Sequence, residues 1–162
     1  MEMLIRDARP DEHATLSDIA FTAKASHGYS TEFMEACRDE LTYSPAWIKS
    51  DSFHFLVAEG DDGIAGFAAI ELSGTGECEL EALFVLPAFS GRGVGTSLMR
   101  RALRHAAGKG FKAMTIQSDP GAVDFYTSFG AELVGESPSG SIPGRMLPQL
   151  RIDLRAERGF VY

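Results

Sequence analysis

The chain has 162 residues, of which 44% are hydrophobic and 23% charged, and this profile favours one soluble globular domain over residues 1–162. Its formal net charge of −8 opposes binding to phosphate backbones, so nucleic acid is excluded as a general partner. No apolar run reaches the ~18 residues of a membrane span, and the N-terminal residues lack a basic, apolar leader. The two cysteines show no disulfide or metal-binding pattern. Together these features predict a cytoplasmic protein without a membrane partner.

The first half of the chain carries two helix signals and four strand signals. Residues 3–9 alternate apolar and polar side chains, and Pro10 then begins a helix over 10–26. Ser30 or Thr31 begins a second helix, which runs to residue 42. Strands follow at 53–60, 64–72 and 77–85, separated by the turn sequences "DDG" and "SGTG".

The second half begins with a glycine-rich loop and a helix over 96–110. One face of that helix is apolar and the other carries arginines; the apolar residues are Leu98, Met99, Ala102, Leu103 and Ala106. A strand at 112–118 and a short helix capped by Asp119 come next, and strands at 131–137 and 147–154 end the pattern. This order predicts an α/β fold with a mixed sheet of six to seven strands, flanked by helices.

The histidines show no metal-ligand spacing, so we expect no metal site. His105 lies among arginines and alanines on the helix over 96–110, and this setting predicts a surface position.

The loop "SGRGVGT" at 90–96 has the composition of a phosphate-binding site. The first N–H groups of a helix lack partners, and glycine lets an anion approach them because it has no Cβ. An arginine adds a permanent charge and a threonine a hydroxyl. The alternative is a tight turn without a ligand. The P-loop and dinucleotide patterns both fit badly. The candidate cofactor-binding residues here are Gly91, Arg92, Gly93, Val94, Gly95 and Thr96.

These residues belong to the stretch "LEALFVLPAFSGRGVGTSLMRRAL", which resembles the cofactor-binding motif of the GNAT superfamily of N-acetyltransferases, Q/R-x-x-G-x-G/A. Ser90 stands where the family usually has Gln or Arg. The stretch "DPGAVDFYTSFGAELVG" is similar to a second family segment, in which Ala122, Phe125, Tyr126 and Gly130 match. There Asp119 replaces the usual Asn, and Ala131 the usual Phe. The order of elements is similar over residues 3 to 155, and the resemblance implies acetyl-CoA as co-substrate and no metal.

The resemblance also implies catalytic roles for Tyr126 and Glu81. A phenol is protonated at neutral pH, so Tyr126 is the candidate acid that protonates the departing CoA thiolate; the alternative is that it only packs the helix on the sheet. Glu81 is the candidate base for the amine proton. By a period of two, Glu81 shares a strand face with Leu83 and Val85. The alternatives are a merely acidic face, or an amine that arrives already deprotonated.

Two further features concern the cofactor. In the family, the backbone of the strand that includes Leu83, Phe84 and Val85 pairs with the pantetheine arm, and the Val85 N–H is a candidate oxyanion donor. Asp119 is favoured as the helix cap over a direct cofactor contact, although both roles can coexist.

The acceptor side is expected to involve the first two helices and the last hairpin. Tyr29, Phe33 and Trp47 are candidates for an apolar pocket, and Arg145 for holding a carboxylate or phosphate, which favours a small acidic amine. Packing or surface positions explain each of them equally well.

The predicted function is acetyl transfer from acetyl-CoA to a primary amine of a small molecule, in a ternary complex. The alternatives are a protein N-terminal or lysine acetyltransferase and, in another class, a non-catalytic acyl-CoA-binding module that regulates a partner. The resemblance is compatible with a homodimer.

Overall fold

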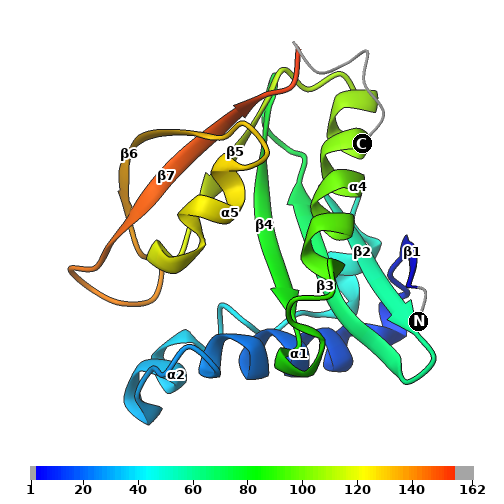
Figure 1. The fold of residues 1–162 in the computed structure, drawn as a ribbon, viewed down its shortest axis with the longest axis vertical. Helices are drawn as coiled ribbons and strands as arrows, with labels where there is room; N and C mark the ends of the chain where they lie inside the picture. The colour runs from blue at the N-terminus through cyan, green and yellow to red at the C-terminus, as the bar shows by residue number, and fades with distance from the viewer. Residues whose placement is uncertain (1–2, 156–162) are drawn as a thin grey trace.

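The computed structural model describes residues 3–155, and a seven-stranded sheet forms its centre (Figure 1). The strand order is β1-β2-β3-β4-β5-β7-β6, and the β4–β5 pair is parallel whereas the other neighbours are antiparallel. The mixed sheet predicted from the order of elements is therefore confirmed. The strands are β1 (Leu4–Asp7), β2 (Phe53–Gly60), β3 (Gly63–Glu71), β4 (Glu77–Val85), β5 (Ala113–Gln117), β6 (Glu132–Pro138) and β7 (Met146–Asp153).

Five α-helices and three short 3₁₀ turns connect these strands within residues 3–155. The second helix stops at Cys37, earlier than the predicted residue 42, and α3 was not predicted from the sequence. Ser44 caps α3 by accepting a hydrogen bond from the Trp47 N–H, and Pro45 occupies its first turn. The helices are α1 (His13–Ala25), α2 (Thr31–Cys37), α3 (Pro45–Lys49), α4 (Val94–Gly108) and α5 (Val123–Thr127).

The sheet separates two apolar clusters. The cluster on one face joins α4 and Tyr126 of α5 to the sheet, and the cluster on the other face joins α1 and α2 to it. The predicted apolar face of α4 is confirmed, because Leu98, Met99, Ala102, Leu103 and Ala106 are all fully buried. On the opposite face, Phe67 is fully buried and its ring packs edge-on against that of Tyr43.

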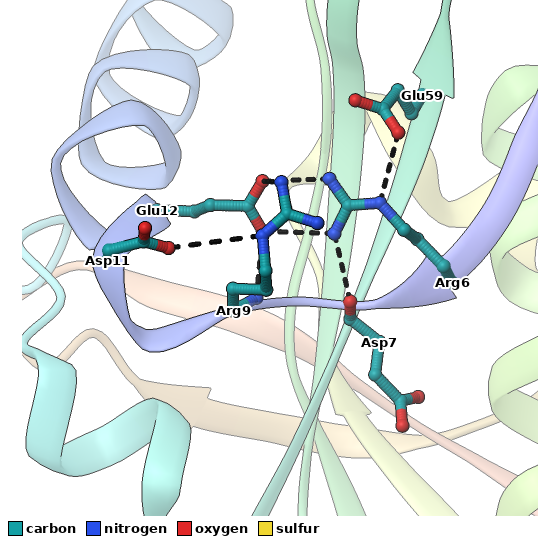
Figure 2. A network of polar contacts seen from close by, with 6 residues as sticks. All are labelled: Arg6, Asp7, Arg9, Asp11, Glu12 and Glu59. Carbon is teal, nitrogen blue, oxygen red and sulfur yellow. Dashed lines mark hydrogen bonds and ion pairs between the residues drawn. The ribbon is translucent and has the colours of Figure 1, made fainter.

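An ionic network fixes the entry into α1 (Figure 2). The Arg6 guanidinium lies 2.7 Å from the Glu12 carboxylate and 3.0 Å from that of Glu59, so it connects β1 with both the start of the helix and β2. Glu12 also accepts a hydrogen bond from the Arg9 N–H at 2.7 Å, which satisfies a donor ahead of the helix. The Arg6 guanidinium holds the pKa of Glu12 below its ordinary value.

His105 is partly buried, so the predicted surface position holds only in part. Its ring stacks on that of His54 with centroids 3.6 Å apart, and its Nε2 atom is buried without a hydrogen-bond partner among residues 3–155. Burial, together with the neighbouring His54, lowers the pKa of His105 to about 4. The ring is therefore a neutral packing group between β2 and α4.

The parallel ladder between β4 and β5 is short. It pairs residues 77–80 of β4 with residues 113–116 of β5 and then stops. Beyond Leu80, the edge of β4 has no β5 partner, and β5, β7 and β6 lean away from its arrowhead (Figure 1). The last five residues of β4 therefore combine a paired edge toward β3 with an open edge.

A β-bulge interrupts β4 at Glu81. Ile70 of β3 pairs with Leu80 and Ala69 with Ala82, so Glu81 is the extra residue. The bulge shifts the alternation by one residue. Leu83 and Val85 consequently pack with Leu80 on the α4 side, and Ala82 packs on the α1 side. The prediction that Glu81 shares a face with Leu83 and Val85 is wrong, because a strict period of two does not survive a bulge.

The buried face of α4 should dominate the stability of the fold. Leu98→Ala should lower the free energy of unfolding by about 2–5 kcal/mol, because it leaves a cavity where the side chain is 0% exposed. The matched control is Leu133→Ala on β6, where the side chain is 62% exposed and a change within about 0.5 kcal/mol is expected. Urea unfolding measures both values, and equal losses would contradict the assignment of the core.

Candidate active site

A cavity of about 260 Å³ opens where β4 and β5 separate. Its lining comes from α1, α5, the segment between α2 and α3, the bulged part of β4, the end of β5, and the segment that joins β6 to β7. The residues that line it are Lys24, His27, Glu40, Leu41, Tyr43, Glu79, Leu80, Glu81, Ala82, Leu83, Phe84, Ile116, Gln117, Asp119, Ala122, Tyr126, Ser139, Arg145 and Leu147.

The glycine loop lies between the end of β4 and the start of α4, and its backbone is shaped to hold an anion. Gly91 and Gly93 have φ values of +76° and +79°, the left-handed region that side-chain-bearing residues avoid. Nothing lies within 4 Å of where a Cβ would project from either glycine. Within the described part of the chain, the N–H groups from Gly91 to Thr96 meet no acceptor. This row of free donors at a helix N-terminus suits a pyrophosphate.

The loop's side chains leave the N–H groups accessible. Arg92 is exposed, lies over the Phe89 ring at 5.6 Å, and makes no ion pair with any residue in 3–155. Val94 is buried and anchors the first turn of the helix in the core. The atoms nearest to where a Gly95 Cβ would lie belong to Phe125 and Val85, both at 3.7 Å, so these two side chains fix the loop against α5 and β4.

Tyr126 projects from α5 into the cavity. Its side chain is 8% exposed, and its hydroxyl has no hydrogen-bond partner among the described residues. Burial, with a smaller effect from the Asp119 carboxylate, raises its pKa above the ordinary value. The phenol is therefore protonated throughout the neutral range, which is the state that a proton donor needs.

Glu81 reaches the cavity from the bulge. The side chain is open to the cavity, yet desolvation, followed by the carboxylates of Glu79, Glu71 and Glu40, raises its pKa to about 7. A carboxyl group with that pKa is suited to accept a proton near neutral pH. The bulge thus presents the candidate base and the candidate acid Tyr126 to one enclosed space.

Asp119 occupies the predicted N-cap position, ahead of the 3₁₀ turn Pro120–Ala122. Its side chain makes no capping hydrogen bond; instead it accepts one from the Tyr29 hydroxyl at 3.2 Å. The same carboxylate lies 3.5 Å from Arg145 and 3.8 Å from Lys24. The predicted N-cap position is therefore confirmed, but the carboxylate interacts with two cations and a phenol from distant segments instead of with a local N–H.

The expected acceptor residues divide into two groups. Tyr29 and Phe33 stack with centroids 4.1 Å apart, and the Arg145 guanidinium lies over both rings, at 5.3 and 4.9 Å. Trp47, in contrast, does not line the cavity. Its ring stacks on Phe53 at 5.2 Å, because α3 carries it to the outer end of β2. Of the four candidates, Arg145 alone lines the cavity, and Tyr29 and Phe33 support it.

Glu40, Tyr43 and Glu79 are among the cavity residues that were not predicted as site residues. Tyr43 is 4% exposed, and its pKa lies above the ordinary value because of burial and of Glu81 and Glu40. Glu40 accepts a hydrogen bond from the Ser141 hydroxyl at 2.8 Å, so it also links α2's C-terminal turn to the β6–β7 segment. Neither Glu40 nor Tyr43 belongs to a sequence motif, so only the packing of distant segments identifies them.

Within residues 3–155, no three His, Cys, Asp or Glu residues are placed to hold a metal ion, and no helix is long and apolar enough to cross a membrane.

Two curated relatives and one solved structure place this geometry among known proteins. An uncharacterized N-acetyltransferase of Methanocaldococcus jannaschii is 26% identical over 137 residues, which cover 79% of this chain and 60% of the relative, less than two thirds of its length. The peptidyl-lysine N-acetyltransferase YjaB of Salmonella typhimurium is 29% identical over 127 residues, 78% of this chain and 77% of the relative.

The solved structure is the PaiA N-acetyltransferase of Thermoplasma acidophilum in complex with coenzyme A. It has a TM-score of 0.75 and 19% identity, and the likeness covers 94% of this chain and 99% of that one, which shows a shared fold. The model of the acetyltransferase (GNAT) family matches residues 14–131, a span that contains the glycine loop, the bulged strand and Tyr126. This match covers more than half of the sequence, and the chain belongs to the GNAT family of acetyltransferases.

Proposed function

We propose that this protein transfers an acetyl group from acetyl-CoA to a primary amine of a small molecule, in a ternary complex. One observation carries the proposal: a carboxyl group with a pKa of about 7 and a buried, protonated phenol open into the same cavity. That cavity adjoins a row of free N–H donors and an open strand edge, the two features that a CoA thioester needs for binding.

The co-substrate would be held by two parts of the backbone. The N–H groups from Gly91 to Thr96 would bind its pyrophosphate, with Arg92 adding charge. The open edge of β4, over residues 83–85, would pair with the pantetheine amides as a further strand. Ala122 lines the adjoining wall, and Phe125 packs against the loop. When bound, acetyl-CoA supplies an acyl group on a good leaving group.

The residues of this chain then handle the protons. Glu81 accepts the proton that the amine loses as its nitrogen bonds to the acetyl carbon. The Val85 N–H stabilises the negative charge on the carbonyl oxygen. Tyr126 donates its proton to the sulfur as the carbon–sulfur bond breaks, and solvent restores it. The products are an acetylated amine and a free thiol, and the protons balance.

A second candidate acceptor is a protein lysine, favoured by the 29% identity to a peptidyl-lysine N-acetyltransferase. The third candidate function is a non-catalytic acyl-CoA-binding module. Thiol release from acetyl-CoA, measured with a panel of small amines and a lysine peptide, separates the three. Release with small amines supports the proposal, release with the peptide alone favours the second candidate, and CoA binding without release favours the module. A cytoplasmic location, one domain over 1–162 and a homodimer stay predictions.

The glycine loop gives a direct test of cofactor binding. Gly93→Ala places a Cβ on a residue with φ of +79°, which costs about 1–2 kcal/mol of backbone strain. The added methyl group also occupies space that the CoA pyrophosphate would need. The Kd for CoA, measured calorimetrically, should rise about ten-fold or more, equal to ~1.4 kcal/mol. The control is Gly76→Ala, at φ +81° in the turn before β4, which carries the same strain away from the loop. Similar CoA affinities for the two variants would sink the assignment.

Glu81 predicts a specific pH dependence. Activity, measured as kcat/KM, should rise with pH through about 7, because only the ionised carboxylate accepts the amine proton. The pKa of Glu81 in the folded chain lies above the ordinary value of 4.5, so the folded chain holds a proton that the unfolded chain releases between pH 4.5 and about 7. Glu81's contribution to stability is therefore lost as the pH rises through that window. Glu81→Gln should abolish this limb of the rate profile and flatten the corresponding fall in Tm; unchanged profiles would contradict the role.

Tyr126→Phe removes the candidate proton donor and keeps the ring in the core. The value of kcat should fall about 100-fold or more, and the Kd for acetyl-CoA should stay within about two-fold, because the hydroxyl acts on the leaving group alone. Stopped-flow thiol release and calorimetry measure the two quantities. An unaltered kcat would return Tyr126 to a packing role.

A further inference from the structure

One wall of the cavity is acidic and lacks countercharges. Glu40, Glu79 and Glu81 line it, and the Glu71 carboxylate is close enough to raise the pKa of both Glu79 and Glu81. In the part of the chain that the structure describes, none of these four carboxylates forms an ion pair with Lys or Arg. We refer to Glu40, Glu71, Glu79 and Glu81 as the acid wall.

The Lys and Arg side chains that line the cavity are paired with a different carboxylate. Lys24 and Arg145 lie 3.8 and 3.5 Å from the carboxylate of Asp119, and Arg145 also donates a hydrogen bond to the Tyr29 hydroxyl at 3.0 Å. They form a separate cluster at the end of β5. Arg145 is therefore weak support for an acidic acceptor, because its guanidinium is already paired with Asp119.

A buried phenol independently indicates a polar ligand at the acid wall. Tyr43 is 4% exposed and lines the cavity, and its hydroxyl has no hydrogen-bond partner among residues 3–155. The ring is held in the core while the hydroxyl oxygen is open to the cavity, where a ligand or water can satisfy it. The carboxylates of Glu81 and Glu40 both raise the pKa of this phenol, and all three residues line the same cavity.

The charge state of the reacting amine determines what the acid wall can bind. The amine attacks as a neutral group. In the reactive complex it therefore does not neutralise the negative charge of the carboxylates around it. A second ammonium on the same molecule would compensate them and would also donate hydrogen bonds. We propose that the acceptor is a diamine or polyamine whose distal ammonium binds Glu40, Glu79 and the Tyr43 hydroxyl; this inference rests on the proposed acetyl transfer.

Three amines of equal chain length test the distal charge. They are 1,5-diaminopentane, 1-aminopentane and 5-aminopentanoate, whose far ends are positive, neutral and negative. The kcat/KM for the diamine should exceed that for the monoamine about ten-fold or more, and the carboxylate should be slowest. Added salt should reduce the differences. Equal values, or a preference for 5-aminopentanoate, would overturn the proposal.

Two isosteric variants test whether the acid wall causes the preference. Glu40→Gln and Glu79→Gln should each lower the ratio of diamine to monoamine kcat/KM about five-fold or more, because each removes one charge and keeps the side-chain shape. Glu132→Gln, on the exposed strand β6, is the matched control and should leave the ratio unchanged. Thermal melts establish that all three variants are folded. An unchanged ratio in both acid-wall variants would refute the assignment.

Calorimetric titration of 1,5-diaminopentane into the CoA complex separates this proposal from acetyl transfer itself. Binding that weakens in Glu40→Gln, with no turnover of any amine, supports the diamine site and overturns the transfer reaction. Turnover of all three amines at equal rates overturns the diamine site and leaves the transfer standing. Neither binding nor turnover overturns both.

Discussion

The early end of the parallel ladder between β4 and β5 is the constraint on which the rest of the site depends. Four residue pairs hold the two strands together, and beyond Leu80 the strands separate. The separation produces the open edge of β4 and the space that the cavity occupies. Because the Cβ position of Gly95 lies 3.7 Å from the Val85 side chain, the free N–H groups at the start of α4 lie next to the end of β4.

The bulge at Glu81 converts this opening into a chemical site. If Glu81 were paired in regular alternation, the faces of all later residues would be exchanged, and Leu83 and Val85 would not pack on the α4 face. With it, the strand keeps its apolar contacts on both faces of the sheet and still presents a carboxylate to the cavity. A bulge beside a candidate catalytic group is a common way to re-aim a side chain at small cost in packing.

Two charged clusters give the cavity opposite ends. At one end, Asp119 joins Lys24 and Arg145, and so connects α1, β5's C-terminal end and the β6–β7 segment. At the other end, the acid wall is held by β3, β4 and the turn after α2, and it keeps its charge unpaired among the described residues. The first cluster stabilises the enclosure, and the second gives the enclosure a preference among ligands. Ser141, bonded to Glu40, connects the segment to the acid wall.

The local patterns predicted more of the fold than of the site. The limits of β2 and β4, the buried face of α4 and the glycine loop all follow from periodicity and turn chemistry within one segment. Four features of the folded chain were wrongly predicted or unassigned. They are the face of Glu81, the partners of Asp119, the stack of His105 on His54 and the position of Trp47. Each of these depends on a residue from a distant segment.

The backbone segment that can bind an anion follows from local sequence, because glycines at 91, 93 and 95 and the following helix act through local conformation. The surroundings of the reacting groups, in contrast, depend on contacts between distant segments. A bulge depends on pairing with β3, and the acid wall depends on three separate segments that meet without forming an ion pair to Lys or Arg among residues 3–155. Electrostatic energy varies with the distance between charged groups and with their burial, and folding sets both.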